Sequence, residues 1–307
     1  MKKQINIVYV DHHGDSALYY DGDDGTILMS NRRNVSMPNV FFGDCNDVQS
    51  DDSIMVLEPI VTTPSHYNIQ YLSKFRYVFA WASKFFETTE IKDKLIEINC
   101  GSELCSPKIL PRDKIGSWDI PWKDKIDGAV VISCNKQSQH QASIYPLREK
   151  LADALFESRY HVDWYGHQQI RKPYYRCSVG DKLSTISKYK FHICTENTYD
   201  PIFSYNYLTE KLTHCIFAGS VPLYMGAYNI DDLLPNKDSF LDLRNFVIKK
   251  DGQITVLRQP LMERIRSFSE ADFKRYIDAT RQTLTDPRGI LHHTDMDRCC
   301  KKMLEVI

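Results

Sequence analysis

The feature that most constrains the fold is an alternation of short apolar runs with helix-forming segments between residues 128 and 226. The runs read as buried strands, and they are GAVVIS (128–133), HVDWYG (161–166), KFHICTEN (190–197) and SVPLYMG (220–226). Segments with helical spacing, such as 144–158 and 208–216, separate them. Strands separated by helices predict a parallel, doubly wound sheet, to which SFLDL (239–243) could add a strand.

The first half of the chain repeats this pattern less regularly. Further strands are predicted at 5–11, 39–44, 53–59, 76–82 and 94–100. The stretch 101–127 is rich in Pro, Gly, Lys and Asp and has no clear period, so we place a domain boundary there. We therefore expect an α/β protein with two Rossmann-like domains, 1–125 and 126–307, facing each other across a cleft. A capping box at Ser269 and Asp272 and a last helix from about Asp295 are also predicted, and that helix could pack back on the first domain.

Composition is typical of a soluble globular protein. Among 307 residues, 42% are hydrophobic and 26% charged, and the net charge of −1 gives no reason to expect nucleic-acid binding. No window of about 18 apolar residues predicts a membrane span. The nine cysteines include no C-x-x-C pair, which favours reduced thiols in a cytoplasmic protein. A secretory-pathway catalytic domain trimmed of its anchor stays open as the alternative.

Polar residues follow the predicted strands where ligands bind in open α/β sheets, at the carboxyl ends. They are Cys134, Asn135 and Lys136, then Gly166 and His167, then Thr195, Glu196 and Asn197, and finally Gly226, with Glu58 in the first domain. The glycines are equally well explained as turn formers. A carboxylate directly after a buried strand, such as Glu196, needs a partner or a ligand.

Glu210 and Lys211 open the helix that follows the third of these strands. Leu208, Leu212 and Ile216 define its apolar face, which places Glu210 nearly opposite and Lys211 at the flank. Neighbouring side chains diverge by about 100°, so we expect no pairing between the two. A lysine in a first turn is mildly unfavourable unless an anion is present, which makes a phosphate site plausible. On these facts alone, two solvated charges on the helix surface explain the pair better.

The segment SKYKFHICTENTYDPIFSYNYLTEKLTHCIFAGSVPLYMG resembles the donor-binding signature of the α-1,3/4-fucosyltransferase family, glycosyltransferase family 10. The matching positions are Tyr189, Lys190, Phe191, Glu196, Asn197, Tyr207, Thr209, Glu210, Lys211, Ala218, Gly219, Pro222 and Gly226. The family's arginine helix and V-D-x-Y-G segment are matched upstream, and PNKDSFLDLRNF (235–246) matches downstream. The resemblance covers about 128–246, and the first domain resembles the family only weakly.

The resemblance implies the GT-B arrangement and a metal-independent enzyme that moves fucose from GDP-fucose to a glycan with inversion, needing no cofactor. Arg148 and Lys211 would neutralise the diphosphate and Glu210 would bind the ribose. Glu196, Asn197 and Tyr207 would line the donor pocket. The acceptor would be an oligosaccharide or glycoprotein glycan, with an α-1,3 or α-1,4 linkage to N-acetylglucosamine.

An inverting displacement needs a base on the acceptor side. Glu58 is the candidate, because it ends an apolar strand of the first domain and LEPIVTTP resembles a family Glu…Pro element. Glu87, Glu90 and Glu97 compete with it. Another nucleotide-sugar donor, or a glycan-binding protein with an inactive donor site, remain alternative functions.

Three other sequence features are explained better without a metal or cofactor site. Asp21-x-Asp23 resembles a metal motif of another glycosyltransferase class but lacks a preceding strand, so its glycines predict a turn. His12 and His13, like His292 and His293, lack further metal ligands at a recognisable spacing. No G-x-G-x-x-G follows a strand, which argues against an NAD enzyme.

Overall fold

The computed structural model describes residues 2–9, 17–81, 84–98, 116–134, 136–167, 170–234, 236–285 and 296–307. The chain divides into two units. Unit 1 comprises Met1–Ile109, Asp200–Tyr207 and His292–Ile307, and unit 2 comprises Leu110–Tyr199 and Leu208–Leu291. Each unit contains its own sheet, and each is described separately below.

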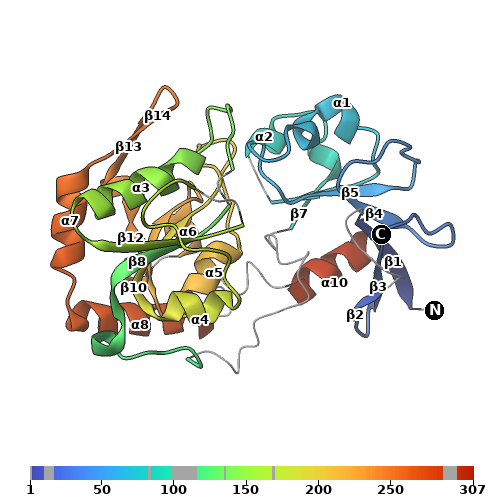
Figure 1. Ribbon diagram of the computed structural model, residues 1–307. Helices are drawn as coiled ribbons and strands as arrows, with labels where there is room; N and C mark the ends of the chain where they lie inside the picture. Colours follow the sequence, from blue (N-terminus) through green and yellow to red (C-terminus); the bar gives the residue numbers. More distant parts are fainter. Residues whose placement is uncertain are drawn as a thin grey trace. The chain divides into compact units, whose positions relative to one another are not determined.

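Unit 1 is built on a seven-stranded sheet of order β2-β3-β1-β4-β5-β6-β7 (Figure 1). The strands are β1 (Lys3–Tyr9), β2 (Ala17–Asp21), β3 (Gly25–Ser30), β4 (Asn39–Phe42), β5 (Ser53–Val56), β6 (Val78–Ala80) and β7 (Leu95–Glu97). All neighbours pair in parallel except β2 and β3, which form a hairpin. A turn follows Asp21, as expected, but the expectation that no strand precedes the motif is wrong, because β2 ends at Asp21. The Asp21 carboxylate accepts from the Thr26 hydroxyl of the paired strand at 3.2 Å.

Both faces of the unit 1 sheet are covered. The helix α10 (Met296–Val306) buries Cys300, Met303 and Leu304 against one face. The short helices α1 (Ile69–Leu72) and α2 (Lys84–Glu87) lie on the other, as Figure 1 shows. A strand buried on both faces is expected to be mainly apolar, and β5 fits this pattern except at its first residue, the buried Ser53.

Unit 2 contains a five-stranded parallel sheet of order β12-β11-β10-β8-β9. The strands are β8 (Ile126–Ile132), β9 (His161–Tyr165), β10 (Tyr189–Thr195), β11 (Val221–Met225) and β12 (Leu241–Asp242). The helix α3 (Tyr145–Glu157) covers one face, while α4 (Lys182–Ser187) and α5 (Glu210–Phe217) cover the other (Figure 1). The doubly wound sheet predicted from the sequence is therefore confirmed for this unit.

The remaining elements of unit 2 complete its core. They are α6 (Ile230–Leu233), the antiparallel hairpin β13 (Val247–Lys250) and β14 (Gln253–Val256), α7 (Arg258–Arg266) and α8 (Glu270–Thr285). The predicted capping box is present, because the Asp272 carboxylate accepts from Ser269 N at 2.8 Å and Ser269 Oγ accepts from Asp272 N at 3.2 Å. The hairpin and α7 were not predicted.

The division of the chain differs in detail from the expected boundary at residue 125. Trp122 belongs to the core of unit 2, where its ring lies 5.1 Å from that of Phe273. The helix α10 belongs to unit 1, as predicted for the last helix. Asp200–Tyr207 also belongs to unit 1, which local composition cannot reveal, because this assignment depends on contacts between segments distant in the sequence, such as the ring of Phe203 against Tyr67.

Candidate donor-binding site

The guanidinium group of Arg148 is the centre of a hydrogen-bond network at the carboxyl edge of the unit 2 sheet. The side chain comes from the first turn of α3 and is only 4% exposed. It donates to Ser133 Oγ at 3.1 Å, beyond β8, and to Thr195 O at 2.8 Å and Glu196 O at 3.0 Å, at the end of β10. Arg148 therefore links two strand ends and brings a buried positive charge to this edge.

Asn197 is oriented by the same guanidinium. Its Oδ1 accepts from Arg148 at 2.9 Å, so the amide nitrogen must point the other way. That nitrogen makes no hydrogen bond to any residue the structure describes, and the side chain is 8% exposed. Asn197 thus holds an amide donor ready for a ligand.

Glu196 is held at the start of α5. Its carboxylate is fully buried and accepts from the backbone N–H of Thr209 at 3.0 Å and from the Thr209 hydroxyl at 2.7 Å. Lys211 Nζ lies 3.3 Å from Oε2 of the same group. The partner that a carboxylate in this position requires is therefore supplied by Thr209, the N-cap of α5, and by Lys211.

Gly226 provides the space for this carboxylate. A Cβ at Gly226 would lie 2.3 Å from Glu196 Cγ and 2.4 Å from the Tyr224 hydroxyl. The glycine is therefore required by a close approach of a neighbouring side chain, rather than by a turn alone. Gly166 is comparable, since a Cβ there would meet Ser133 O at 2.3 Å.

The expectation that Glu210 and Lys211 do not pair is wrong. Lys211 Nζ lies 3.5 Å from Glu210 Oε1, and its side chain is about one quarter exposed, at 23%. The two residues occupy the first two positions of α5. Although their Cβ atoms diverge, both side chains are long enough to bend toward the start of the helix, where Glu196 also attracts the ammonium group.

The structure brings five of the predicted site residues together in unit 2, and they are Arg148, Glu196, Asn197, Glu210 and Lys211. Sequence reasoning listed Thr209 as a motif position without a role and did not single out Lys182. The role of Thr209 is signalled by its position immediately before the helix, which is typical of an N-cap. Lys182 opens α4, whose N-cap Asp181 accepts from the backbone N–H of Ser184 at 2.7 Å.

The other two predicted residues, Glu58 and Tyr207, belong to unit 1. Glu58 follows β5, is half-buried, and accepts through its backbone oxygen from the Tyr67 hydroxyl at 3.4 Å. Burial, and next the Glu58 charge, raise the pKa of Tyr67. Tyr207 packs against Trp81 with the ring centroids 4.8 Å apart. The competing carboxylates Glu87, Glu90 and Glu97 are all exposed.

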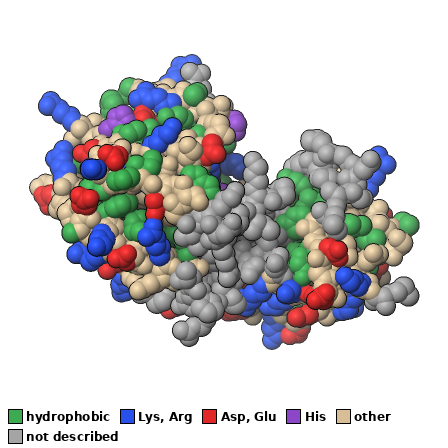
Figure 2. Space-filling view, turned by 90° about the horizontal axis from the view of Figure 1, so that it is seen from below, with side chains coloured by type: hydrophobic (Ala, Val, Ile, Leu, Met, Phe, Trp, Pro, Cys, Tyr) green, Lys and Arg blue, Asp and Glu red, His purple; other side chains and the backbone are tan. Residues whose placement is uncertain are grey.

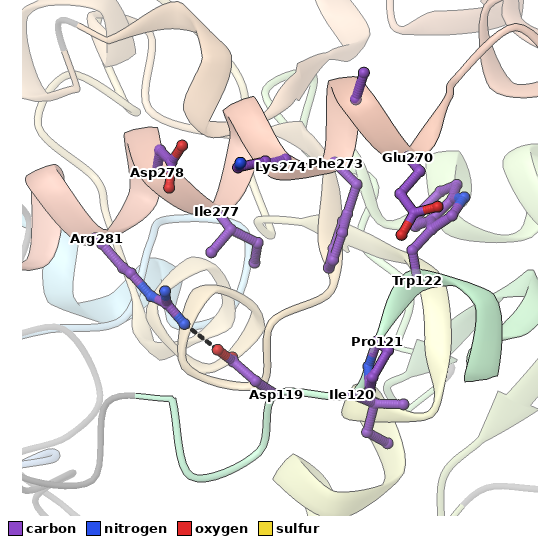
Figure 3. A pocket seen from close by; sticks show the side chains of 11 residues that line it. Asp119, Ile120, Pro121, Trp122, Glu270, Phe273, Lys274, Ile277, Asp278 and Arg281 are labelled. Atoms are coloured by element: carbon purple, nitrogen blue, oxygen red, sulfur yellow. Dashed lines mark hydrogen bonds and ion pairs between the residues drawn. The ribbon is translucent and has the colours of Figure 1, made fainter.

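A separate cavity of about 610 Å³ lies in unit 2 between α8 and the segment 119–122. Figure 3 shows Phe273 and Ile277 pointing from α8 toward this segment and Arg281 paired with Asp119. It shares no residue with the network around Arg148. Among the described residues, no cluster of three potential metal ligands occurs. His12, His13, His292, His293 and Asn135 lie outside the described residues.

The described surface and the described helices bear on the classes of binding partner expected from the sequence. Basic and acidic side chains are interspersed on the face shown in Figure 2, without a broad basic stripe. Among the described helices, none combines the length and apolar character needed to cross a membrane.

The fold is that of the GT-B glycosyltransferases. A solved α-1,3-fucosyltransferase with GDP is similar over 90% of this chain and 81% of its own, with a TM-score of 0.54 and 18% identity. An α-glucosyltransferase in complex with UDP and DNA is similar over 88% of this chain and 72% of its own, with a TM-score of 0.53 and 11% identity. At these identities the likeness concerns the fold alone.

The sequence narrows this class to one family. Residues 120–260 match the family described as glycosyltransferase family 10 (fucosyltransferase) C-term. A fucosyltransferase-like protein of Arabidopsis thaliana is 33% identical over 99 residues, which is 32% of this chain and 17% of that protein. A 4-galactosyl-N-acetylglucosaminide 3-α-L-fucosyltransferase of Pongo pygmaeus is 32% identical over 149 residues, which is 47% and 36% of the two chains.

A third relative, an α-(1,3)-fucosyltransferase of Helicobacter pylori, is 33% identical over 69 residues, which is 22% of this chain and 13% of that protein. The matches thus span between 13% and 36% of the relatives' own lengths. The family expected from the ordered motifs is confirmed.

Proposed function

We propose that this protein transfers L-fucose from GDP-fucose to a hydroxyl group of a glycan, with inversion at the anomeric carbon and without an essential metal. The observation that carries the proposal is the family match over residues 120–260, together with the convergence of its motif residues at one sheet edge. The relatives' names support an α-1,3 or α-1,4 linkage, and that of the Pongo pygmaeus relative supports an N-acetylglucosamine-containing acceptor.

The chemistry assigned to unit 2 is stabilisation of the leaving group. As the bond between the fucose C1 and the phosphate oxygen breaks, its electron pair passes to the diphosphate, and fixed cations stabilise the developing charge. Lys211 supplies an ammonium group at the start of α5. Most N–H groups of Arg148 already donate to protein oxygens, so Arg148 contributes chiefly its charge and the orientation of Asn197.

Glu210 and Asn197 are assigned to the nucleoside part of the donor. The Glu210 carboxylate would accept from ribose hydroxyls, and the Asn197 amide would donate to the nucleotide. The assignment of Tyr207 to the donor rests on the family resemblance alone, because this side chain is only 3% exposed and packs against Trp81 within unit 1. Glu196, being fully buried, is reassigned from lining the pocket to holding Thr209 and Lys211 in place.

Glu58 is assigned the role of general base. It would take the proton of the acceptor hydroxyl while that oxygen forms its bond to C1. Among the candidate carboxylates, Glu58 is the one that combines a position after a buried strand with partial burial; Glu87, Glu90 and Glu97 are exposed.

Calorimetric titration with GDP-fucose, GDP-mannose and UDP-glucose, followed by turnover with a panel of N-acetylglucosamine-containing glycans, tests the proposal. We expect selective GDP-fucose binding and transfer. Because a UDP-using enzyme has nearly the same structural similarity, preferential UDP-sugar binding would overturn the assignment. Tight GDP-fucose binding without transfer to any glycan would favour an inactive glycan-binding protein.

A further inference from the structure

Lys182 lies on α4, whose start points toward the edge of the sheet where the donor is proposed to bind. It is the first residue of α4, whose six residues end at Ser187, directly before β10 begins at Tyr189. The chain therefore reverses between the two elements. With rises of about 1.5 Å per helical residue and about 3.3 Å per strand residue, Lys182 is level with the middle of β10, near His192. Its long side chain can reach the end of that strand.

The charges around Lys182 confirm this placement. Its electrostatic neighbours include Glu210 and Lys211 at the start of α5, and Glu196 at the end of β10. Burial lowers the pKa of Lys182, and the nearby Lys211 lowers it further, while Glu210 raises it. Lys182 also lowers the pKa of His192 and His214, after the larger effect of burial.

Lys182 has no protein partner of its own in the described part of the chain. Its half-buried ammonium group makes no hydrogen bond and no ion pair with any described residue. The nearby carboxylates are already engaged, because Glu196 binds Thr209 and Lys211, and Glu210 lies 3.5 Å from Lys211. A partly desolvated cation without a partner is unfavourable in the protein alone, and an anionic ligand would compensate it.

The field at this edge favours an anionic ligand. Lys182, Lys211 and Arg148 outnumber the two acids at the same edge, Glu196 and Glu210, and α5 begins here with its positive dipole end. The anionic part of the proposed donor is its diphosphate, whose charged oxygens accept hydrogen bonds from cationic side chains.

We propose that Lys182 is a third cation of the donor site and binds a phosphate oxygen of the nucleoside diphosphate. The inference rests on the proposed function and extends it, because it adds a residue outside the predicted motif to the group that stabilises the leaving diphosphate. It also explains why an ammonium group without a protein partner is kept half-buried beside Lys211.

The test compares Lys182→Met with Lys188→Met by calorimetry with GDP and with guanosine. Lys188 is the exposed C-cap of the same helix and serves as the matched control. We expect Lys182→Met to weaken GDP binding about 10- to 30-fold and to leave guanosine binding unchanged, because guanosine lacks the phosphates. The melting temperature should stay constant or rise, since a desolvated charge is replaced by an apolar chain of similar length.

The measurements distinguish a failure of the proposed function from a failure of the role proposed for Lys182. If the wild-type protein does not bind GDP, the proposed function fails. If the wild-type binds GDP and Lys182→Met binds it equally well, or loses guanosine affinity by the same factor, Lys182 is not a phosphate ligand. A lower melting temperature with unchanged GDP affinity would show that Lys182 instead balances the charge of Glu210.

Discussion

Lys211 Nζ lies 3.3 Å from Oε2 of Glu196, a carboxylate that is completely buried. The lysine thus has a structural partner inside the protein as well as a proposed role toward the donor. A carboxylate in this position depends on its cation and on Thr209, because burying an unpaired charge is strongly unfavourable. The same ammonium group also approaches Glu210, so it is positioned between two acids at the start of α5.

Replacing Lys211 by alanine should therefore affect stability and donor binding together. We expect the free energy of unfolding to fall by about 1–3 kcal/mol, because Glu196 loses a charge-assisted contact, and GDP affinity to fall at least about tenfold. Urea denaturation and calorimetry measure the two effects separately.

A second substitution separates the two roles of Lys211. In the double variant Lys211→Ala with Glu196→Gln, the buried charge is gone, so we expect much of the lost stability to return. GDP affinity should stay low, because no cation has been restored. Full recovery of GDP affinity in the double variant would show that Lys211 acts only by neutralising Glu196.

Gly226→Ala should displace the side chain of Glu196. The new Cβ would lie 2.3 Å from Glu196 Cγ, and the surrounding side chains are buried, so we expect a loss of about 1–3 kcal/mol in unfolding free energy. GDP affinity should fall with it, as Glu196 and Lys211 shift. Gly180→Ala is the control, because nothing lies within 4 Å of a Cβ there. Equal unfolding midpoints for the two variants would contradict the close packing at Gly226.

Two buried histidines should make the protein sensitive to mild acid. Burial, and next the charge of Lys182, lower the pKa of His192 and of His214 to about 3. The unfolded chain binds these protons below pH about 6.5, whereas the folded protein does not, so stability falls as the pH drops from 6.5 toward 3. The slope approaches about 1.4 kcal/mol per pH unit for each histidine.

Urea denaturation between pH 7.5 and pH 5 measures this slope. The single variants His192→Gln and His214→Gln should each have a shallower dependence than the wild-type protein, whatever their stability at pH 7.5. His167→Gln is the control, because the His167 side chain is exposed. An unchanged slope in both buried variants would show that these groups are protonated in the folded protein.

The sequence predicted the unit 2 sheet well because its strands are buried on both faces and hence largely apolar, as in GAVVIS. The strand-end rule also placed Asn197, Glu210 and Lys211 at one edge, whereas Arg148 was added by the family resemblance. The contact between Glu210 and Lys211 was missed, since a helical wheel gives the direction of Cβ and not the path of a long side chain.

Other features depend on contacts that no local pattern contains. Glu196 was interpreted as a pocket residue because the sequence cannot show that Thr209 donates to its carboxylate. The segment between the two residues passes through unit 1 before Thr209 begins the approach to α5. The hairpin β13–β14 was missed because its strands are short and largely exposed, so they lack the alternation that identifies a half-buried strand.

Glu58→Gln should reduce turnover without weakening donor binding. If Glu58 removes the proton of the acceptor hydroxyl, the amide cannot replace it, and kcat should fall about 10²- to 10⁴-fold while the Kd for GDP stays unchanged. Rates are measured with GDP-fucose and the best acceptor of the glycan panel. Glu97→Gln is the matched control, because Glu97 is an exposed carboxylate at the end of the edge strand β7 of the same unit. Full activity in Glu58→Gln, with loss in Glu97→Gln, Glu87→Gln or Glu90→Gln, would move the catalytic base to that competing carboxylate.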